Sequence, residues 1–275
     1  MLSIRKKTVL STLLIALFLA VEGFPFYIMF VGAFKPNMAL RLLPPDINLF
    51  GKLVTANFTY VVQKSEIWLW LFNSFLIGIF VALITVLIAA TAGYAFAKLR
   101  FPFSGALFAV IIATMILPKQ ILLIPNYLVA LNLRLTDSLW GVIITTVTPP
   151  FGVFLCRQFM QTIPMELSES AEMDGCSEPG KFLRIVLPLS LPAVGALGVF
   201  AFFAAYNDYL WQLVMISSKK LHTIPIGIAM FAQKATANTG YQLMAAALAT
   251  VPVLILFISC QRFFVKGITL GGVKG

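Results

Sequence analysis

Residues 67–97 form an apolar stretch without a single charged side chain. A helix needs about 20 apolar residues to cross the hydrocarbon core of a bilayer, which is about 30 Å thick. This stretch is therefore predicted to cross a membrane as a helix. Comparable apolar runs occur at residues 8–34, 101–117, 138–156, 185–216 and 241–260. The pattern predicts an all-α, polytopic membrane protein with about six transmembrane helices.

The composition supports a membrane protein and excludes an ordinary soluble enzyme. Hydrophobic residues make up 60% of the chain and charged residues 11%, whereas soluble domains have about 45–50% and about 25%. The net charge of +10 fits basic residues that flank membrane spans, so the expected contact is membrane lipid and not nucleic acid. Arg5, Lys6 and Lys7 precede the first run and favour a cytoplasmic N-terminus. An even number of crossings then places the C-terminus on the same side.

The sequence contains no recognisable catalytic or metal-binding constellation. Cys156, Cys176 and Cys260 lie far apart, and His222 is the single histidine. Zinc sites need several such ligands in a cluster, and an intramembrane hydrolase needs a nucleophile with a nearby base. We therefore expect no catalytic residue, no metal ligand and no enzymatic activity in this chain.

The acidic residues gather in one polar interval, residues 157–184. Half of the 10 acidic residues lie there, namely Glu166, Glu169, Glu172, Asp174 and Glu178. The interval is predicted to form two short helices, with Thr162 and Ser177 as their N-caps and Gly175 in the left-handed position that ends the first. Carboxylates on such an amphipathic helix–turn–helix can orient a partner protein. A solvated loop without a partner explains the same spacing equally well.

A partial nucleotide-binding motif overlaps this interval. Residues 175–181 read G-x-x-x-x-G-K, but Phe182 stands where a P-loop has the Ser or Thr that ligates Mg²⁺. Pro179 also lacks the backbone N–H that a phosphate cradle uses. We attribute the match to chance and do not expect this chain to bind ATP itself.

The same interval resembles the EAA loop of binding-protein-dependent ABC importer permeases. That loop reads EAA, three residues, Gly, nine residues, I-x-L-P, and the spacing here fits throughout. The one departure is a serine where the second residue is usually alanine. The residues that carry this likeness are Glu169, Ser170, Ala171, Asp174, Gly175, Ile185, Leu187 and Pro188.

A second likeness indicates the carbohydrate (maltose-type) branch of this family. Asn207-Asp208-Tyr209-Leu210 is similar to that branch's signature, with Tyr206 in place of the usual tryptophan. The ending of the chain, residues 271–275, also resembles this group. Together the likenesses cover essentially the whole chain.

The resemblance implies a type I ABC importer permease whose EAA loop is a cytoplasmic coupling helix. It implies these partners: a second permease subunit, expected to form a heterodimer, two ATP-binding subunits, and an extracytoplasmic solute-binding protein. ATP would be bound by the partner subunits, so no cofactor is expected in this chain. The implied location is the cytoplasmic (inner) membrane of a prokaryote, with both termini cytoplasmic. The outer segment 217–240, with Lys219, Lys220, His222 and Lys234, is expected to meet the binding protein.

The expected organisation follows from these assignments. Residues 1–66 hold the first transmembrane helix and the first external loop. Residues 67–264 form the transmembrane core, which includes the coupling loop at 162–188. Residues 265–275 form a cytoplasmic tail.

Candidates for the substrate path lie around an acidic residue in the fifth apolar run. Ionisable groups inside a span usually face a cavity or a partner, and aromatic and amide groups surround this one. The candidates are Tyr206, Asn207, Asp208, Tyr209 and Trp211. A hydrogen bond between helices, or a position at the outer interface, is the structural alternative for the carboxylate.

The solute itself is not fixed by the sequence. No basic residue is apparent within the spans, which favours a neutral sugar or oligosaccharide over glycerol-phosphate-type solutes, the main alternative. A stand-alone secondary transporter is a further alternative, but it should show inverted repeats and paired broken helices.

Overall fold

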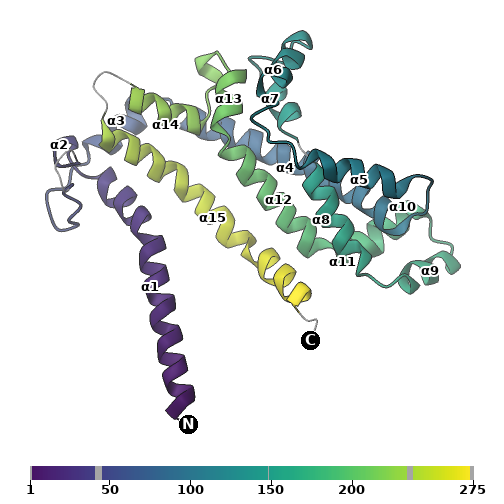
Figure 1. The fold of residues 1–275 in the computed structure, drawn as a ribbon. Helices are drawn as coiled ribbons and strands as arrows, with labels where there is room; N and C mark the ends of the chain where they lie inside the picture. Colours follow the sequence, from purple (N-terminus) through teal and green to yellow (C-terminus); the bar gives the residue numbers. More distant parts are fainter. Residues whose placement is uncertain (1, 41–44, 148, 234–237, 273–275) are drawn as a thin grey trace. The chain divides into compact units, whose positions relative to one another are not determined.

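The computed structural model describes residues 2–40, 45–147, 149–233 and 238–272, and these contain helices but no strand (Figure 1). The elements are, in order, α1 (Leu2–Ala33), α2 (Asn37–Leu40), α3 (Ala56–Lys64), α4 (Ile67–Lys98), α5 (Ser104–Thr114), α6 (Leu123–Asn132), α7 (Leu139–Thr146), α8 (Pro150–Gln161), α9 (Glu166–Met173), α10 (Glu178–Lys181), a π-helical turn η1 (Phe182–Val186), α11 (Leu187–Leu189), α12 (Leu191–Tyr206), α13 (Tyr209–Met215), a 3₁₀ turn η2 (Lys219–Leu221), α14 (Ile224–Gln233) and α15 (Thr239–Gly272).

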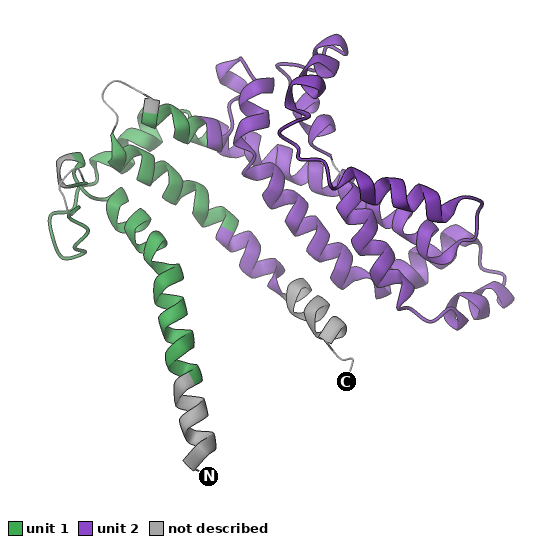
Figure 2. Ribbon diagram, in the orientation of Figure 1, with its two compact units in different colours: residues 1–68, 227–253 green, residues 69–226, 254–275 purple. Residues whose placement is uncertain are grey.

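The chain divides into two compact units (Figure 2). Unit 1 comprises residues 1–68 and 227–253, and unit 2 comprises residues 69–226 and 254–275. The expected domain boundary after residue 66 stays a prediction. The boundary between the two compact units also divides α15, after residue 253. The expected tail begins within α15, which the structure continues to Gly272.

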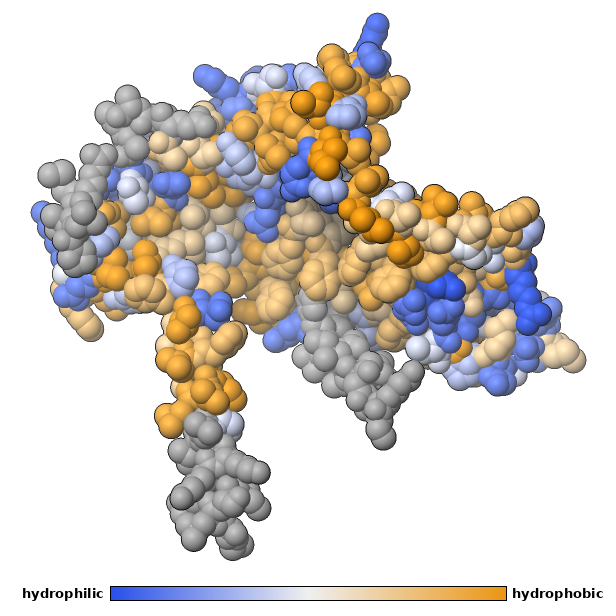
Figure 3. Space-filling model, viewed as in Figure 1, coloured by the Kyte–Doolittle hydropathy of each residue, from blue (hydrophilic) through white to orange (hydrophobic). Residues whose placement is uncertain are grey.

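Among the described residues, three helices are long and apolar enough to cross a membrane by themselves. They are the 11–33 part of α1, the whole of α4, and the 239–261 part of α15. The side chains of these helices are largely exposed, and apolar residues cover the described part of α1 (Figure 3). Apolar surface of this extent on a helix is typical of contact with lipid or with other membrane helices. The all-α polytopic fold class is confirmed.

Two of the remaining apolar runs form pairs of helices with a bend between them, although a continuous apolar run predicts a single helix. The run 138–156 forms α7 and α8, and the bend between these helices lies next to Pro149 and Pro150. The run 185–216 is divided by a bend of 79° between Leu189 and Leu191. Pro188 and Pro192 flank this bend, and because proline lacks an N–H, each removes one helical hydrogen bond.

Helix α5 is shorter than the run 101–117 suggests. It contains 11 residues, which is about 16 Å at the rise of an α-helix. Phe103 precedes it in the left-handed region, at φ 62°, and Pro118 follows soon after it. Because the residue before a proline avoids helical geometry, the helix cannot extend through Leu117. Helix α6 is likewise a short apolar helix, of 10 residues.

The core of unit 2 lies where α4, α8 and α12 approach one another. Ala89, Ala90, Val153, Cys156 and Leu197 are among its buried members. Glycine makes the approach of α4 to α8 possible, since a Cβ on Gly93 would lie 2.5 Å from the Cβ of Cys156. Helix α8 also packs against α5.

Unit 1 is fastened by polar contacts next to the end of α1. The Asn57 side chain donates hydrogen bonds to the carbonyls of Ala33 (2.8 Å) and Lys35 (2.9 Å). The buried ammonium of Lys35 lies 3.3 Å from the Asp46 carboxylate. Tyr60 on α3 stacks on Tyr241 of α15 with ring centroids 4.1 Å apart.

Candidate functional site: an acidic helical turn and a polar cavity

The acidic interval folds as two short helices, and Gly175 ends the first of them as predicted. Gly175 has φ +77°, and its N–H donates to the carbonyl of Glu172 at 2.9 Å. The N–H of Cys176 donates to the carbonyl of Ala171, also at 2.9 Å. These two bonds form a Schellman motif. The spacing of Ala171 and Gly175 in the EAA pattern therefore matches the geometry of a helix end: Ala171 lies in the last turn of α9, and Gly175 is the left-handed residue that follows the helix.

The start of this helix differs from the prediction. Helix α9 begins at Glu166, with Met165 at its N-cap position. Thr162 is instead the C-cap of α8, and its hydroxyl donates to the Phe159 carbonyl at 2.7 Å. Pro164 explains the shift, because it keeps Ile163 out of helical geometry. Ser177 stands at the N-cap position of α10 as predicted, without a side-chain capping bond.

The first half of the EAA pattern presents its side chains to the surface. Glu169, Ser170, Asp174 and Gly175 are exposed, and Ala171 is half-buried. Met173, beside them, is 89% exposed, which is unusual for a large apolar side chain outside a membrane-spanning helix. Hydrophilic residues gather at the end of unit 2 that carries α9 (Figure 3). The geometry provides an exposed surface with negative charge and with exposed apolar side chains, of which Met173 is the most exposed.

The second half of the pattern lies at the bend before α12. Ile185 belongs to η1, and Leu187 and Pro188 begin α11. Ile185 and Leu187 are half-buried and Pro188 is exposed. A π-helical turn such as η1 often marks a functional segment. The structure thus places these three residues between α9 and α12 and not on the exposed face of α9.

Lys181 ties the acidic turn together and is almost fully buried. Its side chain is 6% exposed, and its Nζ lies 3.0 Å from Glu172 on α9 and also pairs with Glu178 on α10. The Tyr94 hydroxyl on α4 donates to Glu178 at 2.7 Å. The hydrogen bonds from Lys181 and Tyr94 lower the pKa of Glu178, and those to the two glutamates raise the pKa of Lys181.

In this network Lys181 connects α9 and α10 by ion pairs. From the sequence, Lys181 stood out only as part of a partial P-loop match, and this role was not predicted. The ammonium of Lys181 pairs with the carboxylates of Glu172 and Glu178, and its backbone N–H donates to the carbonyl of Ser177, the N-cap residue of α10. The i, i+3 spacing of Glu178 and Lys181 was the signal that could have indicated the pair. The contact with Tyr94 has no sequence signal, because the two residues are 84 positions apart.

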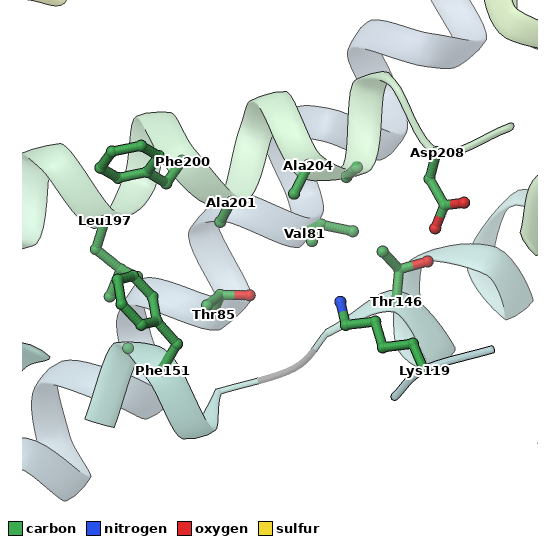
Figure 4. A pocket seen from close by; sticks show the side chains of 12 residues that line it. Val81, Thr85, Lys119, Thr146, Phe151, Leu197, Phe200, Ala201, Ala204 and Asp208 are labelled. Carbon is green, nitrogen blue, oxygen red and sulfur yellow. The ribbon is translucent and has the colours of Figure 1, made fainter. Parts of the chain in front are cut away.

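A cavity of about 310 Å³ lies within unit 2 (Figure 4). Helices α4, α7, α8 and α12 contribute to its wall, together with Lys119 and Asp208. Figure 4 shows the Lys119 side chain reaching into it, toward the Thr85, Thr146 and Asp208 oxygens. The cavity adjoins the break between α7 and α8, and broken helices commonly shape ligand sites in transporters.

The predicted path residues occupy different environments. Asp208 lines the cavity, and its carboxylate also accepts the Trp211 N–H at 3.1 Å as the N-cap of α13. Tyr206 is buried, where its ring stacks on Phe202. Asp208 is the one candidate of the five that belongs to the described lining of this cavity.

The other candidates pack or bond elsewhere. The Trp211 indole donates to the Thr145 hydroxyl at 2.9 Å, which joins α13 to α7. The Asn207 amide donates to the Phe203 carbonyl at 3.0 Å. Tyr209 is half-buried at the start of α13.

Sequence reasoning missed three polar residues of the cavity, namely Thr85, Lys119 and Thr146. The threonines resemble ordinary residues of apolar helices, and Lys119 lies in the turn between α5 and α6, outside any apolar run. Lys119 supplies a basic group to the cavity from outside the spans, where the expectation of no basic residue did not apply. The signal that could have indicated it is a lysine directly after Pro118, at the end of a short helix.

The described residues of the segment 217–240 include helical elements. Among them are η2 and α14, and the Asn73 side chain donates to the carbonyls of Lys220 (3.0 Å) and His222 (2.8 Å). Lys219 and Lys220 are exposed. Lys234 lies outside the described residues.

Comparisons with known proteins identify the family of this chain. The model of the family "Binding-protein-dependent transport system inner membrane component" matches residues 86–270. The arabinooligosaccharides transport system permease protein AraQ of Bacillus subtilis is 32% identical over 92% of this chain and 90% of its own length. The sn-glycerol-3-phosphate transport system permease protein UgpE of Salmonella choleraesuis is 33% identical over 96% of both chains.

A solved structure supports the fold. A chain from the crystal structure of a bacterial ABC transporter involved in the import of the acidic polysaccharide alginate superposes with a TM-score of 0.83, at 18% identity, over 95% of this chain and 98% of its own. The fold, the EAA pattern and the family match agree. This chain belongs to the binding-protein-dependent transport system inner membrane components, the multi-pass permeases of ABC importers.

Proposed function

We propose that this chain is a transmembrane permease subunit of an ATP-driven importer that moves a carbohydrate across the inner membrane by alternating access. The observation that carries the proposal is the exposed acidic helix α9, which Gly175 ends and Lys181 fastens to the rest of unit 2. The names of relatives support the solute class, since AraQ transports arabinooligosaccharides. UgpE, a glycerol-phosphate permease of similar identity, keeps that solute class as the alternative.

In this proposal α9 is the coupling helix and docks on an ATP-binding subunit. Glu169, Ser170, Ala171, Asp174 and Gly175 make the contact, because they lie on or beside the exposed face of α9. Carboxylates favour register and specificity in such an interface, and Met173 supplies an apolar anchor. Ile185, Leu187 and Pro188 transmit the movement, because they lie at the bend that leads into α12.

The assembly contains a second permease subunit in a heterodimer, two ATP-binding subunits that bind all of the ATP, and an extracytoplasmic solute-binding protein. Both termini of this chain are cytoplasmic, so that α9 faces the ATPases and the segment 217–240 faces the binding protein. Tyr206, Asn207, Asp208, Tyr209 and Trp211 lie along the path or position the residues that do. Asp208 is the candidate with a place on a cavity wall.

The decisive experiment reverses one exposed charge on α9. Glu169→Lys should abolish co-purification of the ATP-binding subunits and sugar uptake, while the permease itself remains folded, because exposed substitutions usually change stability by about 0.5 kcal/mol or less. Glu66→Lys reverses an exposed acidic residue in unit 1 and serves as the matched control. Retained docking and uptake in Glu169→Lys would exclude α9 as the coupling helix.

The same preparation distinguishes the secondary transporter. Uptake into proteoliposomes should require ATP on the side of the membrane that α9 faces. It should persist when no proton gradient is present. Uptake that follows the proton gradient and ignores ATP would replace the ABC assignment with a stand-alone transporter.

A further inference from the structure

The cavity in unit 2 has one apolar and one polar part. Phe151 and Phe200 provide aromatic surface, and Leu197 and several alanines complete the apolar part (Figure 4). Thr85, Thr146, Lys119 and Asp208 provide the polar part. Small-molecule sites are mostly apolar with a few placed polar groups. A sugar ring matches such a wall, because its C–H faces are apolar and its hydroxyls project from the edge.

Two hydroxyls of the polar part belong to threonine side chains whose oxygen atoms are buried. The Oγ1 atoms of Thr85 and Thr146 are buried and have no hydrogen-bond partner among the described residues. Threonine in an apolar helix ordinarily bonds to a carbonyl of the preceding turn, as Thr91 on the same α4 does with Leu87 at 2.8 Å. Buried polar groups without partners are rare and call for a cause. A polyhydroxyl ligand can both donate to these oxygens and accept from them.

The charges on the wall indicate which polar ligand is favoured. Lys119 and Asp208 are the two charged residues that line the cavity within the described chain. A phosphate group is attracted by Lys119 but repelled by the neighbouring carboxylate. A neutral hydroxyl can accept from the ammonium and donate to the carboxylate at once. The pair therefore suits a neutral polyol better than an anion.

We propose that Thr85, Thr146, Lys119 and Asp208 form a binding site for a neutral sugar inside this subunit. The inference rests on the proposed function and deepens it, since it names the subunit's own contact residues and its solute class. The volume of about 310 Å³ lies at the low end of the range of about 300–1,000 Å³ for small-molecule sites. The site thus holds a small sugar, or one segment of a longer chain, as it passes.

The first test removes the two hydroxyls without changing side-chain shape. Thr85→Val and Thr146→Val are made in the full transporter in proteoliposomes, with uptake of maltose, arabinotriose and sn-glycerol 3-phosphate measured below saturation. Each variant should lower sugar uptake about three- to tenfold, the effect of one lost hydrogen bond. Thr91→Val, an exposed position whose hydroxyl is already bonded to Leu87, should transport like the wild type.

Stability separates a binding role from a packing role. Because Thr85 and Thr146 have unpartnered hydroxyls, their replacement by valine should leave the melting temperature unchanged or raise it. Reduced uptake with unreduced stability supports the site. Uptake equal to that of Thr91→Val overturns it.

The second test changes the charges. Asn at position 208 can still accept the Trp211 N–H, so Asp208→Asn removes the charge and keeps the cap of α13. It should raise the ratio of sn-glycerol 3-phosphate uptake to sugar uptake about tenfold, and Lys119→Gln should lower that ratio. A wild-type transporter that prefers sn-glycerol 3-phosphate to both sugars overturns the inference while the importer function stands. A wild type without ATP-dependent uptake of any of the three contradicts the proposed function itself.

Discussion

Tyr94 on α4 donates a hydrogen bond of 2.7 Å to Glu178, which lies 84 positions later in the acidic turn. Lys181 joins the same carboxylate and that of Glu172 on α9. The exposed helix is thereby fastened to a helix long enough to cross the membrane. These side chains connect α9 to α4, while the chain itself connects α9 to α12 through α10, η1 and α11.

Replacement of Lys181 should loosen this connection. In Lys181→Met the carboxylates of Glu172 and Glu178 lose their shared cation, but both are at least half-exposed and can be hydrated. We therefore expect a loss of about 1–2 kcal/mol in the free energy of unfolding, typical of a charged hydrogen bond with partly exposed partners. Thermal unfolding in detergent measures this loss, and the ATP hydrolysed per sugar imported should rise. Arg184→Met, at an exposed position three residues on, is the control, and equal behaviour of the two variants would contradict the role of Lys181.

Substitutions of Gly175 should follow backbone preference and not side-chain size. A Cβ at this position meets no atom within 4 Å, but the φ of +77° disfavours other residues. The left-handed conformation costs about 1–2 kcal/mol for an ordinary residue and less for asparagine. Coupled uptake should therefore fall in the order Gly175→Asn, Gly175→Ala, Gly175→Val. Transport assays in a strain that lacks the native permease measure this order, and a variant with asparagine that is as impaired as valine would exclude the explanation.

The sequence predicted the features that depend on local chemistry. The long apolar runs became α1, α4 and α15, and the Ala171–Gly175 spacing became a Schellman turn, because composition and glycine act over a few residues. The same approach placed the start of α9 wrongly, since it overlooked the effect of Pro164 on Ile163. Short α5 and the bend of 79° at Ser190 were also not foreseen. A hydropathy average does not detect such breaks, because a proline interrupts a helix without making the segment polar.

The cavity shows a different limit of sequence reasoning. Thr85, Thr146 and Asp208 lie on three segments far apart in the chain. No periodicity relates them, because only the packing of α4, α7 and α12 brings them together. Asp208 was found because a carboxylate in an apolar run is conspicuous. Threonines are not, and their significance comes from the missing partner and not from the residue type.

The contact of Asp137 with the 217–218 segment should depend on pH. Its carboxylate accepts from the N–H groups of Ser217 (3.0 Å) and Ser218 (2.8 Å) and from the Ser218 hydroxyl. The bonds from Ser218 and then from Ser217 lower the pKa of Asp137 below its ordinary value of 3.8. A lowered pKa means that the stabilisation is complete above pH 3.8 and is lost as the pH falls through the pKa of the folded protein.

Hydrogen exchange measures this dependence. The Ser217 and Ser218 amides should be equally protected from neutral pH to about pH 4 and should lose protection at lower pH, after correction for intrinsic exchange. Asp137→Asn keeps an acceptor but not the charge, so protection should be weaker at all pH values and should no longer change with acid. Acid-dependent exchange that persists in Asp137→Asn would assign the effect to another group.

The close approach of α4 and α8 should make Gly93 intolerant of any side chain. A Cβ there would lie 2.5 Å from the Cys156 Cβ and 3.0 Å from the backbone N of Arg157. Overpacking of this kind costs about 1–3 kcal/mol, so Gly93→Ala should lower the melting temperature of the purified permease. Gly105→Ala, at a helical glycine with nothing within 4 Å, should be neutral or slightly stabilising.

A double-mutant cycle can assign this loss to the contact itself. Cys156→Gly removes the nearer of the two atoms, so it should restore part of the stability that Gly93→Ala loses, and the two effects should not be additive. The recovery should be incomplete because the Arg157 backbone remains 3.0 Å away. Additive losses of stability in the double variant would show that the helices separate on substitution. The contact with Cys156 would then not be the reason why Gly93 does not tolerate a side chain.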